Sequence, residues 1–537
     1  MKLSTLTLLA VSAFIVVGCG KGNFSERNNQ VQENVLRYPV PNNPTSLDPG
    51  IVQDGDTLDM LQQVYEGLVG WDENNNVVPL VAEKWEVSDD GTEYTFFIRE
   101  GVKFHNGRQV TAEDIKWSIE RAARPAFKST TADAYLSDVI GVTEMVNGQA
   151  DNIPGIEVVD DMTVKFKLKQ PTPYFLGKLT YMVSYPVPKE VVPEDSELTD
   201  YTKAVGCGPY KLVKYDDKQL AVLEPYEDYW GGKPALTRIE RPIMLDPTTR
   251  LTKYKNGEVD LVQLQRSDIE GVKKDFGDQL VYLDRPAIWY VGLNQEVYAP
   301  FKDKRVRQAF AMAIDRDKIV NVQMGGVNTL ANTIVPPGVR GHRDKGAGFD
   351  YNVEAAQKLL AEAGFPGGKG MPALTLTHRE GYTDIKLVAE SVASQIEANL
   401  GVKVEVQPME WRKYLEDYNN KKHAFYHMRW AADYLDPQNF LSHMLATWGP
   451  ENKLGYSSPQ FDALCKQADT LLDWDARVPL YQQAEDVVLQ DAVWIPIYFQ
   501  RDVELQSPRL QNMRESLFWS LAAHNDNRRG CEVARNA

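Results

Sequence analysis

The pattern of apolar residues changes near residue 300, and this change limits the folds open to the chain. Between residues 353 and 400, two amphipathic stripes each end at a glycine and lead into a run of β-forming residues, "ALTLTH" and "VKVEVQ". The stripes are Val353, Ala356, Leu360 and Ala363 before Gly364, and Ile385, Val388, Val392 and Ile396 before Gly401. Apolar spacings of three and four residues predict helices, and the runs that follow predict strands. The second half is therefore expected to alternate α and β.

Residues 35–300 contain mainly runs that predict strands and turns. Examples are "YTFFI" at 94–98, "TVKFKL" at 163–168 and "LAVLE" at 220–224. The clearest helix begins at Thr111, where Asp114 three residues later completes a cap-like start before the apolar face of Ile115 and Ile119. A strand-rich first half and an α/β second half predict separate lobes, and ligands often bind between lobes.

The first twenty residues are typical of an export signal. One early cation, Lys2, precedes an uncharged apolar run that ends in small residues at Gly18, Cys19 and Gly20. The run is also barely long enough to cross a bilayer, so an uncleaved anchor is the alternative. The ending "VVGC" resembles a bacterial lipobox, which implies that Cys19 is acylated and becomes the mature N-terminus. The polar stretch after it predicts a flexible tether.

Length, charge and cysteine content further limit the number of domains, the binding partners and the disulfides that the protein can have. A chain of 537 residues is too long for one simple core and predicts two or three domains. Its formal charge of −16 argues against a general binder of nucleic acids or anionic membranes. Besides Cys19, the chain has Cys207, Cys465 and Cys531. These three can form at most one disulfide, and the sequence does not select which.

Two candidate metal sites are weak, and no metal or cofactor is expected. Asp72, Asn74, Asn76 and Glu83 follow an EF-hand count, but Val77 replaces the required glycine, so a polar turn between strands is the better interpretation. His423 and His427 are four residues apart in an aromatic segment. In an extended strand they would lie about 13 Å apart, which is too far to share one ion.

Two acids in the stretch "RWAADYLDPQNF" have different predicted roles. Asp436 precedes Pro437, so the pair is typical of an N-cap and first residue of a helix over "PQNFLSHML". Proline disfavours a helical conformation before it, so Asp433 and Asp436 are not expected one turn apart. This argues against the interpretation of the two acids as the catalytic pair of a retaining glycosidase, whose carboxylates lie about 5 Å apart. Asp433 is left either to meet a ligand or to form a salt bridge with a residue such as Arg429.

Several stretches together resemble the family 5 extracellular solute-binding proteins of ABC importers, and most closely the oligopeptide-binding proteins. They are "PTSLDP", the long block from "VYEGLVGWDENNN" to "IKWSIERA", "GCGPYKLV", "PFKDKRVRQAFAMAIDRDKI" and "RWAADYLDP". The resemblance implies an α/β, three-lobed periplasmic-binding-protein-like (type II) fold, with the ligand enclosed between two hinged lobes. It divides the chain into a signal (1–18), a tether (19–34), lobe I (35–62, 183–285 and 498–537), lobe II (63–182) and lobe III (286–497).

The resemblance also implies binding residues. Asp433 matches the acid that pairs with a peptide's α-ammonium, and Trp430 and Trp411 match aromatic residues near side-chain pockets. The loop "VQDGD", with Gln53 and Gly55, matches a segment whose backbone runs beside the peptide, and Gly55 is the residue expected to contact it. The chain departs from the family pattern at three positions, where Arg429 replaces a common Gly, Tyr418 replaces a common Arg, and Cys207 replaces a common Thr. The first two change the size and charge of the pocket.

The expected function is that of a non-enzymatic receptor. It would capture short peptides and deliver them to an ABC permease and ATPase complex, as a monomer held at the cell envelope by lipid on Cys19, on the periplasmic or extracellular face. Alternative cargoes within the resemblance are nickel, haem and oligosaccharides. A glycoside hydrolase is the alternative from another class, although no nucleophile elbow G-x-S-x-G and no C-x-x-C is present.

Overall fold

The computed structural model describes residues 34–72, 74–511 and 532–533. The predicted signal, Cys19 and Cys531 lie outside these residues. The chain from Asn34 onward forms one compact unit, and it contains three larger sheets. In the described residues, no helix combines the length and the apolar character needed to cross a membrane.

The first sheet has the strand order β1-β10-β9-β8. Its strands are β1 (Val35–Arg37), β8 (Tyr210–Asp216), β9 (Leu220–Pro225) and β10 (Arg238–Pro242). β1 pairs parallel with β10, and the other pairs are antiparallel. Residues of this sheet share a buried cluster with Met60 and Leu61 of α1 (Gly55–Leu61). The start of the chain and residues 210–242 therefore fold together.

The second sheet has the order β4-β5-β7-β6, and every pair in it is antiparallel. Its strands are β4 (Ala82–Val87), β5 (Glu93–Ile98), β6 (Ile156–Asp160) and β7 (Thr163–Lys167). Helix α2 (Ala112–Ala123) begins as predicted, because the Asp114 carboxylate accepts hydrogen bonds from the backbone amide and hydroxyl of Thr111, both at 2.9 Å. Its buried face, with Ile115 and Ile119, joins the core of this sheet.

Short elements surround the second sheet. They are the hairpin β2 (Val69–Trp71) and β3 (Val77–Pro79), the helices α3 (Ala132–Leu136), α4 (Val142–Val146) and α5 (Phe175–Lys178), and the 3-10 turn Met182–Ser184. The 3-10 turn Tyr201–Lys203 packs against the first sheet instead. In the hairpin turn, Asp72 accepts hydrogen bonds from the amides of Asn74 and Asn76. The EF-hand-like count is therefore the predicted polar turn between strands.

The third sheet belongs mainly to the second half and has the order β11-β17-β12-β16-β14-β15, with β13 beside β17. Its strands are β11 (Leu261–Gln263), β12 (Leu280–Leu293), β13 (Thr329–Leu330), β14 (Leu374–Arg379), β15 (Val404–Met409), β16 (Phe425–Ala431) and β17 (Trp494–Gln506). β14 is parallel to both neighbours, β15 and β16. This is the predicted α/β alternation.

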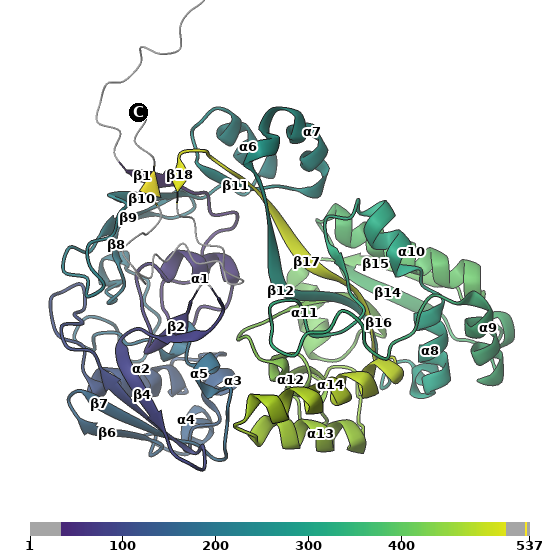
Figure 1. The fold of residues 1–537 in the computed structure, drawn as a ribbon, viewed down its shortest axis with the longest axis horizontal. Helices are drawn as coiled ribbons and strands as arrows, with labels where there is room; N and C mark the ends of the chain where they lie inside the picture. The colour runs from purple at the N-terminus through teal and green to yellow at the C-terminus, as the bar shows by residue number, and fades with distance from the viewer. Residues whose placement is uncertain (1–33, 73, 512–531, 534–537) are drawn as a thin grey trace, which may run out of the picture. The chain divides into compact units, whose positions relative to one another are not determined.

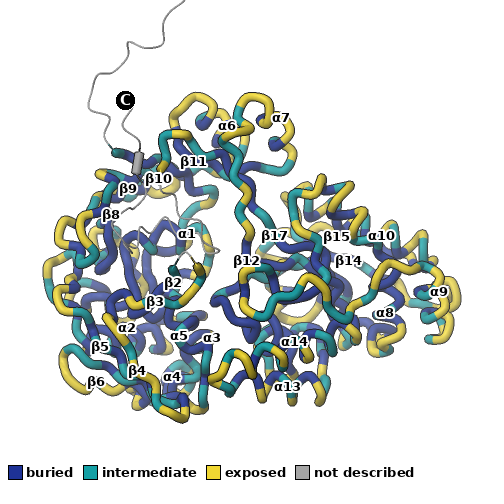
Figure 2. Tube along the Cα trace, viewed as in Figure 1, coloured by how far each residue is buried: buried dark blue, intermediate teal, exposed yellow. Residues whose placement is uncertain are grey.

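Helices pack on both faces of the third sheet. One buried cluster holds residues of α8 (Lys304–Met312), α9 (Val353–Glu362) and α10 (Thr383–Leu400). A second holds residues of α11 (Trp411–Asn419), α12 (Ser442–Leu445), α13 (Pro459–Thr470) and α14 (Trp474–Gln490). The strands between them are mostly buried, whereas α9 carries many exposed residues (Figure 2). α10 ends at Gly401 with a left-handed φ of 71°, as the sequence pattern predicts.

The long strands β12 and β17 run side by side and link two cores (Figure 1). Near Leu280 and Leu505 they contribute to a cluster with α6 (Pro247–Lys255) and α7 (Arg266–Phe276). Farther along, Val291 and Ile495 lie in the cluster with α8 to α10. The register shifts between Asp284 and Ile288, so the strand pair bends where it passes from one core to the other.

The predicted helix over residues 437–445 forms only in pieces. A 3-10 turn covers Pro437–Asn439, and α12 covers only Ser442–Leu445. A side chain of this segment makes a long-range contact instead, because Ser442 donates to Asp469 at 2.8 Å. Tertiary hydrogen bonds therefore override the local helix propensity.

The buried ion pair between Arg121 on α2 and Asp48 generates a stability prediction. Nη1 and Nη2 of Arg121 donate to the two carboxylate oxygens of Asp48 at 2.9 and 2.6 Å, and both side chains are almost fully buried. Arg121→Ala leaves the Asp48 carboxylate without its cation, so the free energy of unfolding should fall by about 3 to 5 kcal/mol. Chemical denaturation measures the difference.

The control for this variant is Arg124→Ala at the end of the same helix. Arg124 pairs with Glu194 at the surface, and exposed pairs contribute about 0 to 1 kcal/mol. Equal losses for the two variants would contradict the view that burial makes the Arg121 pair important.

Candidate functional site

The two acids of residues 429–440 lie in different environments. Asp436 is buried, caps the 3-10 turn by accepting from the amide of Gln438 at 2.9 Å, and receives Nη1 and Nη2 of Arg477, both at 3.0 Å. The predicted capping role of Asp436 is confirmed. Arg477 is itself fully buried, so this carboxylate already has a cation and is not available to a ligand.

Asp433 has polar partners but no cation. Its backbone amide donates to the side-chain oxygen of Asn439 at 3.1 Å, and the Asn439 amide donates to its carboxylate at 3.5 Å. The Tyr135 hydroxyl also donates to the carboxylate. Among the described residues, no lysine, arginine or histidine lies within salt-bridge distance of Asp433, so the alternative salt bridge to Arg429 is not formed.

The surroundings of Asp433 disfavour a lone negative charge. Burial raises the pKa of the carboxyl to about 6, the hydrogen bonds from Tyr135 and Asn439 oppose this rise, and the charge of Glu451 adds to it. The side chain nevertheless keeps a partly exposed surface. A carboxylate that is enclosed by protein, open to solvent and without a counter-charge favours a positively charged ligand.

Aromatic residues from the first half of the chain reach this acid. Tyr135 of α3 stacks on Tyr181 with ring centroids 3.7 Å apart, and Asp433 raises the pKa of both hydroxyls after the larger effect of burial. Beside it, Tyr434 stacks on Tyr174 at 5.9 Å. These tyrosines were not identified from the sequence, because nothing local in "TADAYLSD" connects them to a residue three hundred positions later.

Trp430 and Trp411, the two predicted aromatic residues, are both partly exposed. The Trp430 ring nitrogen donates to Asn439 at 3.1 Å, so Trp430 and Asp433 share one partner. Trp411 begins α11, and the guanidinium of Arg379 lies 4.4 Å from the centroid of its ring. Arg379, at the end of β14, is a further candidate that the sequence did not indicate.

Three other predicted binding residues differ in how far they are exposed to solvent. Gln53 is exposed and donates to Thr130. Gly55 is the first residue of α1, is exposed, and a Cβ added there would meet no atom within 4 Å. Tyr418 is only 4% exposed and packs edge-on against Tyr426 in the core. Gln53 and Gly55 are thus accessible to a ligand, whereas Tyr418 lies beneath the surface.

Arg429 lies near the end of strand β16 and is paired directly opposite Trp289 of β12. Its side chain reaches solvent. The protein around the guanidinium nevertheless removes part of its hydration, which lowers its pKa. None of the described residues forms a hydrogen bond or ion pair with this side chain. Like Asp433, Arg429 is a recessed charge that remains open to solvent.

The histidine pair does not form a metal site. His423 is held by Thr377 at 3.1 Å and by the Tyr414 carbonyl at 3.0 Å, and His427 is buried within β16 beside Trp289. Within the part of the chain that the structure describes, no group of three potential metal ligands occurs. The cysteines that the structure describes, Cys207 and Cys465, are both buried and unpaired.

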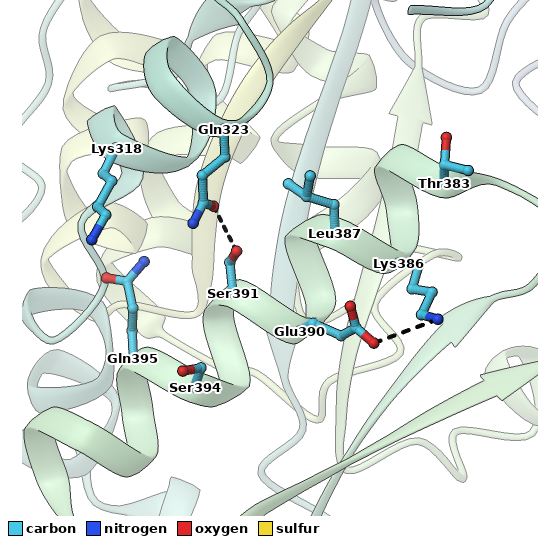
Figure 3. Close-up of a pocket in the computed structure, with 9 residues that line it drawn as sticks. All are labelled: Lys318, Gln323, Thr383, Lys386, Leu387, Glu390, Ser391, Ser394 and Gln395. Carbon is cyan, nitrogen blue, oxygen red and sulfur yellow. Dashed lines mark hydrogen bonds and ion pairs between the residues drawn. The ribbon is translucent and has the colours of Figure 1, made fainter. Parts of the chain in front are cut away.

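A separate hollow of about 750 Å³ lies between the π-helical turn Lys318–Gln323 and α10 (Figure 3). It contains none of the predicted binding residues. Its polar groups are partly paired with each other, since Ser391 donates to Gln323 at 2.6 Å and Lys386 lies 3.7 Å from Glu390. The hollow is therefore not the candidate site.

Comparisons with known proteins agree on one family. Residues 76–452 match the model of the bacterial extracellular solute-binding proteins, family 5 Middle. The chain is 29% identical to the dipeptide-binding protein DppE of Bacillus subtilis (95% of this chain, 96% of the relative) and 29% identical to the heme-binding protein A of Haemophilus influenzae (96% and 98%). The solved structure of the Escherichia coli murein tripeptide binding protein MppA matches with a TM-score of 0.78 and 25% identity, over 94% and 99% of the chains.

The raised pKa of Asp433 predicts a pH-dependent effect of Asp433→Asn on the ligand-free protein. Because the folded state binds this proton more tightly than the unfolded state, ionisation of Asp433 lowers stability as pH rises from about 4 to about 6. The variant should therefore gain stability over the wild type by about 2 kcal/mol more at pH 7 than at pH 4.5. Urea denaturation at the two pH values measures this.

Asp278→Asn removes one exposed carboxylate and is the control for net charge. An advantage of Asp433→Asn that is the same at both pH values would mean that the folded environment does not disfavour the charge.

Proposed function

Because the chain belongs to the bacterial extracellular solute-binding proteins of family 5, we propose that it is the extracytoplasmic receptor of an ABC importer and that its cargo is short peptides. The observation that carries the proposal is Asp433, a recessed and partly exposed carboxylate with no cation beside it. The α-ammonium of a peptide supplies the missing charge. The relatives named for a dipeptide and a murein tripeptide support this cargo over haem, for which one relative is named.

The ammonium would bind where the Tyr135 hydroxyl and the Asn439 amide already point at the carboxylate. An ion pair in such a water-poor site is stronger than one at the surface, and the hydrogen bonds hold the carboxylate oxygens in place. A ligand that lacks the positive charge would leave Asp433 ionised without compensation, or protonated. Specificity for a free N-terminus follows from this arrangement.

The rest of the peptide would be bound largely through its backbone. The loop from Val52 to Asp56 is proposed to run beside it, and the open space at Gly55 leaves room for a close backbone approach. Trp430 and Trp411 would line pockets for side chains. Contacts to the backbone provide affinity for many sequences, which suits a transporter of mixed peptides.

The three lobes predicted from the sequence serve this proposal. The ligand would lie between lobe I and lobe III, with β12 and β17 as the connection about which they close. Tyr135 and Asp433, which come from different parts of the chain, interact in this arrangement, and the closed, loaded form would be the one that the permease recognises. As a receptor, the protein would release its cargo unchanged, whereas a hydrolase would release cleaved products.

Truncation of the charge at Asp433 should weaken peptide binding strongly. Removing one partner of a desolvated charge pair costs about 2 to 5 kcal/mol, or about 30-fold to several thousandfold in affinity. Asp433→Asn should therefore raise Kd by that factor in calorimetric titrations. Asp278→Asn removes an exposed acid that is not among the candidate binding residues, and it should bind like the wild type.

N-acetylated peptides provide a second test of the same contact. Acetylation removes the ammonium and leaves the remainder of the ligand intact, so the wild type should discriminate against it, and Asp433→Asn should not. If the wild type binds acetylated and free peptides equally, Asp433 does not hold the N-terminus. Mass spectrometry of the material released on denaturation identifies the natural cargo.

Lipid on Cys19 is proposed to hold the receptor at the cell envelope. This rests on the sequence "VVGC", which lies outside the described residues. Cys19→Ala should leave the signal uncleaved or release the protein from the membrane fraction, because the thiol is the acylation site. Unchanged fractionation and an unchanged mass of the mature protein would rule out the anchor.

A further inference from the structure

We propose that Tyr434 is a latch residue, whose ring holds the segment after β16 against the core of the second sheet while a peptide is bound and so slows the release of the peptide. The inference rests on the proposed function and adds to it a contact that does not touch the ligand. Tyr434 directly follows Asp433 in the chain. One short segment would therefore carry both the acid that binds the cargo and the ring that keeps the protein closed around it.

Tyr434 is buried in a core that otherwise belongs to the first part of the chain. The hydrophobic cluster of the second sheet has buried members from Leu68 to Cys207, and among the described residues Tyr434 is the buried member that comes from beyond this range. Its ring stacks on that of Tyr174, with the centroids 5.9 Å apart and the planes 10° apart. Tyr434 is 2% exposed and Tyr174 is 6% exposed. An aromatic side chain from the second half thus fills a place in the core of the first.

Gly177 in α5 provides the room for this contact. A Cβ added at Gly177 would lie 3.1 Å from the Cβ of Tyr434 and 3.7 Å from the ring of Trp71. The first of these distances is shorter than side chains normally pack. Gly177 does not have a left-handed φ, so its backbone conformation does not require glycine. The close approach of Tyr434 is therefore what leaves little space for a side chain there.

Two more contacts join the same two parts of the chain. Leu472, between α13 and α14, packs so closely on the turn between β4 and β5 that a Cβ at Gly91 would lie 2.6 Å from its side chain. Burial raises the pKa of the Tyr94 hydroxyl on β5 to about 12, and the positive charge of Arg477 on α14 opposes this rise. Arg477 therefore lies close to the second sheet. Tyr434 is thus part of an interface between the two halves and not an isolated contact.

One short turn connects the latch to the acid that is proposed to bind the ligand. The Tyr434 hydroxyl donates to the side chain of Gln438 in the 3-10 turn Pro437–Asn439. In the same turn, Asn439 accepts from the amide of Asp433 and donates to its carboxylate. A peptide ammonium that holds Asp433 in place would therefore also order the turn to which the Tyr434 ring is tied.

The latch would contribute to affinity because it favours the closed form. Separation of the two halves at this interface would expose the ring of Tyr434 to water, which is unfavourable for a large apolar surface. The apparent affinity for a ligand falls when the binding-competent form becomes less populated. A weaker latch would therefore weaken binding without any change in the contacts to the peptide. Most of the effect should appear in the rate of peptide release, as is usual for changes at interfaces.

The experiment first offers the wild type, freed of its natural cargo by unfolding and refolding, a synthetic pool of mixed-sequence peptides two to six residues long. Mass spectrometry identifies a peptide that is retained, and this peptide is then titrated into each variant by calorimetry. Tyr434→Ala should raise its Kd by about tenfold or more, the effect expected of a buried aromatic residue at the centre of an interface. Tyr434→Phe keeps the ring and should keep most of the affinity.

Gly177→Ala adds a methyl group to the same contact from the opposite side. Alanine favours a helix more than glycine does, so the melting temperature of the ligand-free protein should not fall. Kd should nevertheless rise by about fivefold or more, because the methyl group overpacks the closed interface. Small-angle X-ray scattering should show that the peptide compacts the wild type more than this variant.

Gly271→Ala is the matched control. Gly271 is exposed in α7, and a Cβ added there would meet no atom within 4 Å. This variant makes the same chemical change in a helix away from the interface, and it should bind the peptide and become compact like the wild type.

The outcomes separate the inference from the proposed function. If Tyr434→Ala and Gly177→Ala bind the retained peptide as tightly as the wild type, or if the peptide does not compact the wild type, the latch is wrong while peptide binding stands. A lower melting temperature of ligand-free Gly177→Ala would make the contact an ordinary part of the core and would also overturn the latch. Gly177→Ala decides the question if Tyr434→Ala does not fold. If no peptide is retained, the proposed function fails, and the inference fails with it.

Discussion

The antiparallel pair of β12 and β17 is the connection on which the arrangement of the site depends. One end of the pair is buried against α6 and α7 and the other against the helices of the second half. Where the register shifts, Arg285 is buried with Asp502 beside it. Because β16 pairs with the far part of β12, this ladder fixes the strand that contains Arg429 and ends two residues before Asp433. As the proposed hinge, a pair of continuous strands can bend while it preserves its backbone hydrogen bonds.

The contrast between Asp433 and Asp436 shows how neighbouring acids acquire different roles. Asp436 has a buried arginine in a two-point contact, and it is therefore part of the folded framework. Asp433 has only neutral donors, which reduce the cost of its charge without cancelling it. A charge left in this state lowers stability in the free protein, and it is the type of group whose energy improves when a cation binds. Strain of this kind is common at functional sites.

A receptor for many peptides has to recognise what all of them share. Every linear peptide has a backbone and, unless modified, an ammonium at one end and a carboxylate at the other. The proposed roles of the Val52–Asp56 loop and Asp433 use these common features and leave the side chains to Trp430 and Trp411. Affinity then depends little on the sequence of the peptide.

Local patterns determined much of the secondary structure. The stripes at residues 353–363 and 385–400, the cap at Thr111 and the β-rich runs all formed the predicted elements, because periodicity and capping act over a few residues. The predicted helix after Pro437 failed for the opposite reason, since side chains there bond to distant residues.

The candidate site was also predicted from the sequence only in part. The sequence placed Asp436 in a capping role and identified Asp433 through its resemblance to a family. Only the tertiary structure decided that Arg477 pairs with Asp436, that Tyr135 reaches Asp433, and that Arg429 has no partner among the described residues. These facts depend on segments that are far apart in the chain and are brought together by packing. Electrostatic environment is a property of the folded arrangement, and a one-dimensional pattern does not contain it.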